Sequence, residues 1–317
     1  MKLNKTLLNK LSRRSLIVTS ETRTMIKRDH SRIILDNAAI NAAQPFFTHV
    51  CQDKGLVVGE GTIEEITDRT STGLTLGDLQ LDKVAPVAYA DETRPVLTCI
   101  NISADAITAT DSYRLITVSG DYEKLPQGLY KATDLSLALA IYGPDMAIDR
   151  GPDGFYGASL IVGDMQIEQA ADYDTYPNWK ALFPDSWTYE VTSTVLPVTK
   201  EIKHPLGSKK QVTVDITGNA IYTVASVDDG KSFVNLDSTI HISHDNFDDD
   251  ATVTINQVFY AHLTKVFNGA PVSIEWIAQN KPILFSQEQT RYLVMPIRHD
   301  RKYAPYCIEK IEGEVSE

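Results

Sequence analysis

One group of residues in this chain has the types and the spacing of a metal or acid–base site. His241 and His244 stand three positions apart and are followed by Asp245 and the acidic run Asp248–Asp250. Imidazole and carboxylate groups are common zinc ligands, so a metal-dependent hydrolase or nuclease is one hypothesis. The competing interpretation is a solvated acidic turn between two apolar stretches. We favour the turn, because no nucleophile or acid–base pair accompanies the cluster.

The sequence contains no other catalytic motif. It has no glycine-rich phosphate loop, no dinucleotide fingerprint and no nucleophile elbow. The cysteines Cys51, Cys99 and Cys307 lack metal-ligand spacing and cannot all pair with one another. That pattern indicates a reducing, cytoplasmic compartment. We therefore expect a protein that is not an enzyme and that uses no metal or cofactor.

Composition and charge narrow the class of protein further. The 317 residues are 43% hydrophobic and 23% charged, which is typical of two or three soluble globular domains. No apolar run has membrane-spanning length, so an integral membrane protein is excluded. The net charge is −12, and most of the chain is acidic. This charge argues against a general nucleic-acid coat protein. The first 24 residues are basic, and we interpret them as an amphipathic helix rather than a targeting peptide.

The elements that would position a functional site are clearest between Arg94 and Leu115. This stretch predicts two strands joined by a tight turn at Asp105, with Ile107 and Ala109 continuing the apolar alternation after the turn. The alternating face of the first strand consists of Val96, Thr98, Ile100 and Ile102.

The same hairpin occurs twice in the sequence. Ile102–Ile107 reads ISADAI, and Ile216–Ile221 reads ITGNAI, with Asp or Asn at the bend. A helix is predicted before each copy and another after it, which indicates a duplicated domain. The four predicted helices are Asp78–Ala90, Thr133–Tyr142, Thr194–His204 and Asn256–Phe267.

Capping and turn residues predict further boundaries. Asp78 and Thr133–Asp134 are expected to be N-caps, Gly143 to end a helix, and Pro86 to kink or shorten one. Further elements are expected as a helix at Asn4–Leu11, strands at Ser15–Thr19, Arg32–Asp36, Gly55–Gly59, Leu74–Leu76 and Gly128–Lys131, and a hairpin at Phe155–Ala170 that turns at Gly163–Asp164.

Three stretches together resemble the bacterial DNA polymerase sliding clamp, the beta subunit. Thr110–Leu115 reads TDSYRL, and the family has T-D-G-H-R-L after the corresponding hairpin. Arg291–Arg298 reads RYLVMPIR, similar to the Met-Pro-hydrophobic-Arg step that closes the family's last domain. Tyr176–Pro184 resembles the aromatic connector that lies between them in the family.

The resemblance implies an α+β fold of repeated clamp-type modules, each with antiparallel sheets and two helices, assembled into a ring. We expect a shortened or divergent N-terminal clamp region over 1–72, a central-type module over 73–185, a last-type module over 186–300 and a tail over 301–317. The family's ring holds six modules. Two per chain would make a homotrimer, and a third, cryptic module would make a homodimer.

The implied function is that of a DNA replication processivity factor. Such a protein encircles double-stranded DNA without reading its sequence, and it tethers DNA polymerase, the clamp loader and other partners through a hydrophobic peptide cleft. Carried over by position, the cleft consists of Leu97, Thr110, Ser112, Tyr113 and Leu115 on one wall, Pro177, Ala181 and Leu182 from the connector, and Leu293, Met295, Pro296 and Ile297 on the other wall. Tyr113 and Ala181 replace His and a basic residue of the family, which predicts an altered motif preference.

In the family, basic helices face the DNA. In this chain the two modules differ in how many basic residues their predicted helices carry. The expected contacts are Lys200, Lys203, Lys209, Lys210 and Lys265. The first module's helices offer only Lys83 against Asp78, Asp82 and Asp134. The alternative is therefore a clamp-derived adaptor or decoy that does not encircle DNA.

The tail invites two interpretations. Tyr303–Ile308 is apolar and aromatic, and the residues after it are acidic. Because the tail leaves from the strand of one cleft wall, Tyr303–Ile308 would be at high effective concentration there and would compete with partner peptides. The favoured alternative is a tail that packs elsewhere or stays disordered.

Overall fold

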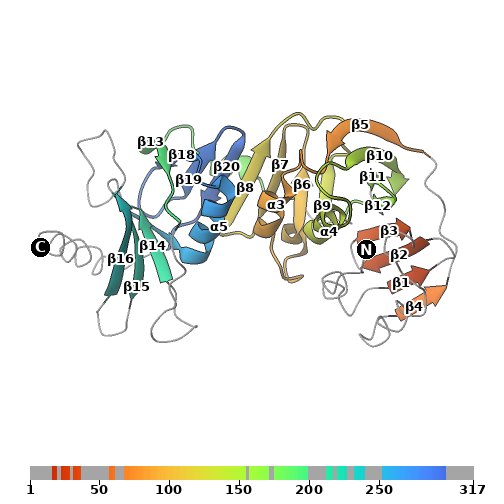
Figure 1. The fold of residues 1–317 in the computed structure, drawn as a ribbon, viewed down its shortest axis with the longest axis horizontal. Coiled ribbons are helices and arrows are strands. Elements are labelled where there is room, and N and C mark those ends of the chain that lie inside the picture. The colour runs from red at the N-terminus through yellow and green to blue at the C-terminus, as the bar shows by residue number, and fades with distance from the viewer. Residues whose placement is uncertain are drawn as a thin grey trace, which may run out of the picture. The chain divides into compact units, whose positions relative to one another are not determined.

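The computed structural model describes residues 16–19, 23–28, 31–36, 57–60, 68–154, 157–170, 175–198, 212–216, 220–226, 232–239 and 252–297 (Figure 1). The chain divides into two compact units. Unit 1 comprises Met1–Ser112 and Ile116–Pro177, and unit 2 comprises Tyr113–Leu115 and Asn178–Glu317. Among the described residues, no helix is both long and apolar enough to span a membrane.

The first sheet of unit 1 joins N-terminal strands to strands from far along the chain. Its order is β4-β1-β2-β3-β12-β11-β10-β5, and all neighbouring strands are antiparallel except β1 and β4. Ile26 of β2 pairs with Ile33 of β3, and both are buried. The bounds are β1 Leu16–Thr19, β2 Arg23–Arg28, β3 Ser31–Asp36, β4 Val57–Glu60, β5 Thr70–Thr75, β10 Ala147–Gly154, β11 Gly157–Val162 and β12 Met165–Ile167.

These strands test several of the expectations. The strands expected near residues 15–19, 32–36 and 55–59 are confirmed as β1, β3 and β4. Strand β5 begins and ends earlier than the expected Leu74–Leu76, and β2 was not predicted. The hairpin of β11 and β12 turns at Gly163–Asp164 as expected. The helix expected at Asn4–Leu11 lies outside the described residues.

The second sheet of unit 1 contains the hairpin from which the resemblance starts. Its order is β8-β7-β6-β9, formed by β6 Cys99–Ile102, β7 Ala106–Thr110, β9 Gly128–Lys131 and the Ile116–Ser119 part of β8 Arg114–Ser119. Ile102 pairs with Ile107, and Ser103 N donates to Ala106 O at 2.9 Å. The predicted turn around Asp105 and the strand Gly128–Lys131 are therefore confirmed.

The start of that hairpin was predicted wrongly. Pro95–Thr98 forms a 3₁₀ helix, η2, so Val96 and Thr98 do not lie on a strand. Proline favours a first helical turn because its φ is fixed and its missing N–H needs no partner there. Thr98 Oγ1 then donates to Pro95 O at 2.7 Å and closes the turn. The backbone preference of Pro95 overrides the apolar alternation.

The helices of unit 1 are shorter or shifted relative to expectation. Helix α3, Leu81–Val84, passes into the 3₁₀ helix η1, Ala85–Val87, so the expected helix over 78–90 is shortened at Pro86 as predicted. Asp78 does not cap it, because its Oδ2 accepts from Thr75 N at 2.7 Å instead. Such a carboxylate closes the preceding turn rather than the helix.

Helix α4 confirms the expected end but not the expected start. It spans Ala132–Tyr142, so Thr133 already lies within the first turn and is not the N-cap. Gly143 ends the helix at φ 82°, and its N–H donates to Leu139 O at 3.0 Å. Glycine adopts this left-handed conformation without the strain that a Cβ brings.

Unit 2 holds one sheet that carries the candidate site and another that carries the repeated hairpin. In the first, β13 Tyr189–Val195, β18 Pro271–Trp276, β19 Ile283–Gln287 and β20 Thr290–Val294 are ordered β13-β18-β19-β20, with the first residues of β8 beside β20. The second has the order β16-β15-β14-β17, with β14 Val212–Ile216, β15 Ala220–Ser226, β16 Ser232–Thr239 and β17 Val253–Asn256.

The repeat in the sequence has a structural counterpart. Ile216 pairs with Ile221 between β14 and β15, as Ile102 pairs with Ile107 in unit 1. Helix α5, Gln257–Phe267, follows as predicted, and the Asn256 side chain accepts from Val258 N. The helix predicted at Thr194–His204 does not begin there, because Thr194 and Val195 end strand β13. Threonine and valine favour strands, and residues 199–204 lie outside the described part.

Strands β13 and β18 place two carboxylates opposite each other. Glu190 pairs in register with Glu275. Burial, followed by the charge of Glu190, raises the pKa of Glu275, while Arg291 opposes the shift. A raised carboxyl pKa means that the ionised form destabilises the folded state at neutral pH, and that this cost disappears as the pH falls through the raised pKa.

We predict that Glu275→Gln raises the denaturation midpoint at pH 7, because it removes the ionised carboxylate and its repulsion from Glu190. The gain should shrink as the pH falls through the raised pKa and disappear below the ordinary glutamate pKa of 4.5, where the side chain is largely protonated in both the folded and the unfolded state. Guanidinium titrations of both proteins across this pH range measure the effect. Glu190→Gln is the matched variant, since it removes the repulsion from the opposite strand. A midpoint that is lower at pH 7 would contradict the assignment.

Candidate functional site

The structure divides the residues that the resemblance assigns to a peptide cleft between its two units. Unit 1 contains Leu97, Thr110, Ser112 and Pro177, and unit 2 contains Tyr113, Leu115, Ala181, Leu182, Leu293, Met295, Pro296 and Ile297. The larger group therefore belongs to one compact body, and its internal geometry is described first.

A backbone hydrogen bond joins the two motifs of the sequence. Met295 N donates to Tyr113 O at 2.7 Å, at the point where β20 ends and β8 begins. Ile297 N then donates to Thr254 O at 2.7 Å, which ties the following residues to β17. The Tyr113–Leu115 end of the TDSYRL stretch and the RYLVMPIR stretch are thus held together in unit 2, although more than half of the chain separates them.

The leucines expected in the cleft form a buried floor. Leu115 and Leu293 are each only 2% exposed and form one cluster with Leu284 of β19. The aromatic residues Trp179, Phe183 and Trp187 of the connector pack against this cluster. These leucines therefore support the surface and are not themselves open to solvent.

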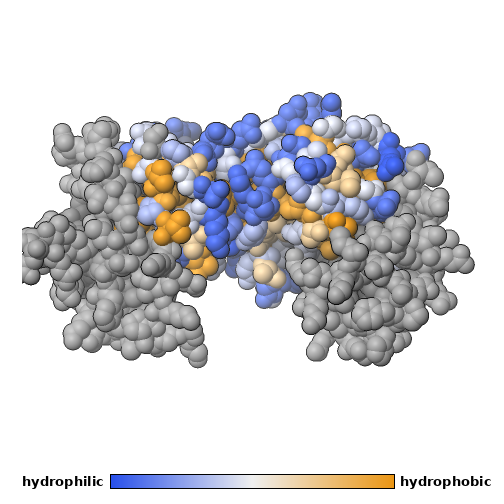
Figure 2. Space-filling model, viewed as in Figure 1, coloured by the Kyte–Doolittle hydropathy of each residue, from blue (hydrophilic) through white to orange (hydrophobic). Residues whose placement is uncertain are grey.

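Three large apolar side chains near these buried residues in the sequence are exposed to solvent. Tyr113 is 57% exposed, Leu182 is 45% exposed and Met295 is 39% exposed. Among the described residues, every exposed large hydrophobic side chain belongs to unit 2, and Figure 2 shows apolar surface (orange) around α5 and its neighbouring strands. Exposed tyrosine and methionine suit an adaptable contact for apolar side chains of a partner. We call Tyr113, Leu182 and Met295 the apolar face.

Cationic side chains hold the connector in place. The connector forms the 3₁₀ helix η3, Trp179–Leu182, which also contains the exposed Ala181. Arg291 of β20 lies 4.0 Å from the centre of the Phe183 ring, and Lys180 lies 5.4 Å from that of Trp179. These cation–π contacts fix the aromatic cover over the leucines.

Arg114 anchors the other edge of the apolar face. Its Nη1 donates to Tyr292 Oη at 3.4 Å, and its guanidinium lies 4.9 Å from the centre of the Phe259 ring of α5. Tyr292 is fully buried and also contacts His262 Nδ1 at 2.9 Å. Arg114 thus faces α5 and holds the start of β8 in place.

Several of these contributors were not among the predicted site residues. Arg114, Trp179, Phe183 and Arg291 lie within the three recognised stretches, so their motifs carried a signal that the residue-by-residue assignment did not use. Trp187 and Leu284 had no such signal. Their contribution depends on packing between distant segments.

The residues of unit 1 differ in accessibility. Leu97 and Thr110 are each 6% exposed, and Ser112 and Pro177 are exposed. Beside Leu97, Cys99 is buried, and this burial raises the pKa of its thiol to about 12. Such a thiol is almost entirely protonated at neutral pH, so Cys99 is no candidate nucleophile.

Solved structures of bacterial clamps share this architecture. The beta subunit of DNA polymerase III from Thermotoga maritima matches with a TM-score of 0.63 at 15% identity, over 94% of this chain and 98% of that one. The Borrelia burgdorferi subunit, in complex with a natural product, gives 0.63 at 10% identity over 94% and 96%. The Helicobacter pylori beta clamp bound to a DNA ligase peptide gives 0.57 at 14% identity over 90% and 76%. The fold is that of a sliding clamp.

The clamp fold is visible in the structure but not in general sequence searches. No family model matches the sequence, and a search of curated proteins found no match. The likeness to the Thermotoga clamp covers 94% of this chain, so it must include a large part of residues 1–72. The N-terminal strands therefore take part in the clamp fold.

The expected DNA contacts are mostly outside the described residues. Lys200, Lys203, Lys209 and Lys210 lie in the part of the chain that is not described, and Lys265 is exposed on α5. In unit 1, Lys83 donates to Gln80 at 2.9 Å, and α4 contains no lysine or arginine. The clamp helices that the structure describes therefore offer few cations.

The metal hypothesis and the tail hypothesis stay untested. His241, His244 and the acidic run after them lie outside the described residues, as does Tyr303–Ile308. Within the part of the chain that the structure describes, no group of three or more His, Cys, Asp or Glu residues could hold a metal ion.

We predict that Cys99 resists alkylation in the folded protein. A variant with Cys51→Ser and Cys307→Ser leaves Cys99 as the single thiol. At pH 8 its thiolate fraction is very small because its pKa is near 12, and the side chain is buried. Maleimide should therefore label it only after guanidinium is added, as mass spectrometry would show. Adding Ser119→Cys at an exposed position provides the reactive control. Prompt labelling of Cys99 in the native protein would contradict its placement.

Proposed function

We propose that this protein is a sliding-clamp-like processivity factor that encircles duplex DNA and tethers DNA polymerase and other replication partners. The observation that carries the proposal is the clamp fold over 94% of the chain. A clamp performs no bond chemistry, which agrees with the lack of a catalytic motif in the sequence. Its action depends on a closed path around DNA and on a surface that holds partners.

The partner surface is proposed to be the apolar face of unit 2. A related clamp is seen bound to a DNA ligase peptide, so short peptides are the natural class of ligand. Tyr113, Leu182 and Met295 offer exposed apolar contact area, and the leucine cluster beneath the connector supplies a rigid support. Such an arrangement suits partners that share a few apolar residues and differ elsewhere.

The ring is proposed to form from several copies of this chain. A head-to-tail ring would cover sheet edges, which otherwise invite unwanted strand pairing. The module boundaries proposed are 1–72, 73–185 and 186–300. The first of these contributes strands to the sheet it shares with β10–β12. With this N-terminal region counted as a module, two chains would complete six modules, and without it three would be needed.

One observation favours an alternative, an adaptor or decoy that keeps the clamp fold without encircling DNA. The described clamp helices offer only Lys83 and Lys265 as cations, and Asp82 lies beside Lys83. Phosphate contacts need clustered positive charge, so these helices alone would hold DNA weakly. The lysines at 200–210 and the basic N-terminal segment decide between the two functions.

We predict that the protein behaves in solution as a ring. Light scattering should give the mass of a dimer or a trimer, and DNA binding should be sequence-independent and fall steeply with salt. A ring threaded on DNA should also be retained on a closed circular plasmid and lost from the same plasmid after linearisation. In the matched control, the closed plasmid is cut only after the protein has bound, which should release a threaded ring. A monomer at high concentration, with equal retention on both forms, would favour the adaptor.

We predict that Met295→Ala weakens binding of a DNA ligase peptide of the kind seen in the Helicobacter complex. Truncating an apolar anchor at the centre of an interface typically costs about 1–4 kcal/mol of binding free energy. Because Met295 is 39% exposed, the fold should persist. Fluorescence anisotropy measures the affinity. Val258→Ala, at a 62% exposed position on α5, is the control. Unchanged affinity in a folded Met295→Ala protein would refute the assignment of the face.

A further inference from the structure

One side of helix α5 in unit 2 changes from apolar to basic along the helix. Val258, in the first turn, is 62% exposed, and Lys265, in the last turn, is exposed as well. Their spacing of seven residues is about two helical turns, so both lie on one face, with the partly buried Ala261 between them. The opposite face contains Tyr260 and Leu263, which are fully buried in the core of the unit.

The last described residues of the chain lead to the start of this helix. Met295 N donates to Tyr113 O, and two residues later Ile297 N donates to Thr254 O at 2.7 Å. Thr254 belongs to β17, and the last residue of that strand, Asn256, caps α5 with its side chain. The chain therefore leaves the junction of β8 and β20 and reaches β17, close to the first turn of α5, just before residue 298.

The segment that follows has the complementary order of properties. Residues 298–317 lie outside the described part of the chain. Tyr303–Ile308 is apolar and aromatic, and residues 309–317 contain four glutamates and one lysine. This order, apolar and then acidic, matches the order of apolar and then basic residues along α5. Tyr303 follows Ile297 by six residues, which span up to about 20 Å when extended, so the apolar part is able to reach Val258.

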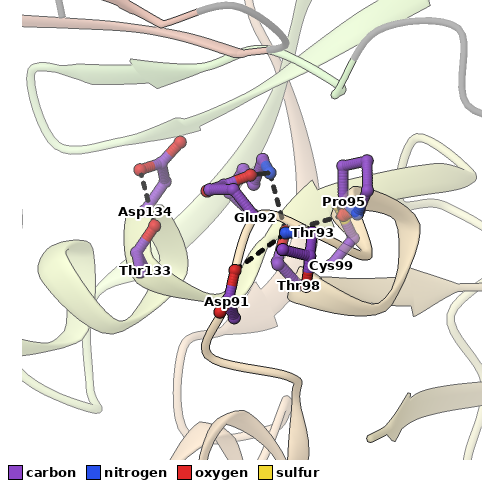
Figure 3. Close-up of polar contacts among 9 residues, drawn as sticks. Asp91, Glu92, Thr93, Pro95, Thr98, Cys99, Thr133 and Asp134 are labelled. Carbon is purple, nitrogen blue, oxygen red and sulfur yellow. Dashed lines mark hydrogen bonds and ion pairs between the residues drawn. The ribbon is translucent and has the colours of Figure 1, made fainter. Parts of the chain in front are cut away.

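Two basic side chains of unit 1 are held by neighbours within that unit. Glu92 Oε2 lies 2.9 Å from Nζ of the buried Lys131 (Figure 3). Arg94 Nη1 donates to Ser112 Oγ at 2.9 Å. Ser112 makes this hydrogen bond although its φ is +78°, in the left-handed region where a Cβ brings strain. Lys265 differs from these cations because it belongs to the same compact unit as the C-terminal segment.

We propose that the C-terminal segment docks on the exposed face of α5, with Tyr303–Ile308 against Val258 and the following glutamates beside Lys265. The apolar contact supplies most of the affinity, because exposed ion pairs contribute little. The connection through the chain adds a high effective concentration. Docking of this kind goes beyond the proposed function and does not depend on it. Since Lys265 is also a predicted DNA contact, the docked segment would occupy a helix face assigned to DNA.

The test uses Cys307, within the apolar part of the segment, as a natural reporter. In a full-length Cys51→Ser background, a second thiol is introduced either as Ala261→Cys on α5 or as Met295→Cys on the apolar face. Cys99 does not compete, because it is buried. Diamide oxidises the thiol pairs to disulfides. Non-reducing electrophoresis and peptide mass spectrometry then measure the rate and distinguish bonds within one chain from bonds between copies.

Ala261→Cys should form the intrachain disulfide about tenfold faster than Met295→Cys, since docking keeps Cys307 near α5. Adding Val258→Asp should abolish this advantage, because it removes the apolar contact and repels the glutamates. An acidic residue in the first turn of a helix is favourable, so the fold should persist. The matched control is Val195→Asp, at a 53% exposed valine of β13, and it should leave the rate unchanged.

Three outcomes would overturn the docking on α5. The first is an equal rate for both thiol pairs, including no disulfide in either, or an advantage that survives Val258→Asp. The second is faster cross-linking of Met295→Cys, which would put the segment on the apolar face as a competitor of partner peptides. The third is a disulfide that forms only between copies, at a rate that rises with protein concentration. None of them affects the DNA and peptide measurements that test the proposed function.

Discussion

The hydrogen bond from Met295 N to Tyr113 O is the interaction on which the candidate site depends. It fixes the start of β8 beside the end of β20, so Leu115 and Leu293 meet Leu284 in one cluster. The aromatic connector then has a surface on which to pack. Without this junction the two recognised motifs would be separate strand ends with no common apolar surface.

The site combines a rigid base with an adaptable surface. The buried leucines are covered by aromatic rings, and cation–π contacts from Arg291 and Lys180 hold those rings. The side chains left exposed are those that can change conformation at low energetic cost, with methionine the most flexible. The proposed binding of several partners would gain from this division, because rigidity lowers the ordering cost of binding while flexible side chains accommodate differences between ligands.

Local features of the sequence predicted local structure well. The two hairpins with their Ile102–Ile107 and Ile216–Ile221 pairs follow from alternation and turn chemistry, and they lie where expected. Two of the errors arose where one residue type overrode a periodic pattern. Pro95 made a 3₁₀ turn from an apparent strand, and the strand preference of Thr194 and Val195 outweighed a helical period.

The site was only partly predictable for a different physical reason. Motif residues such as Tyr113 and Met295 could be named because they are contiguous with recognisable steps. The cover provided by Trp187 and the floor provided by Leu284 depend on contacts between distant segments, for which no spacing rule exists.

The backbone of Ser112 has a consequence for how this protein would respond to selection. Two demands on this residue conflict, since replacing it with glycine relaxes the backbone but removes the hydroxyl that accepts a hydrogen bond from Arg94. Natural or laboratory selection for heat tolerance alone would therefore tend to drift toward glycine here. Persistence of serine under such selection would mean that its hydrogen bond to Arg94 contributes more than the backbone strain costs.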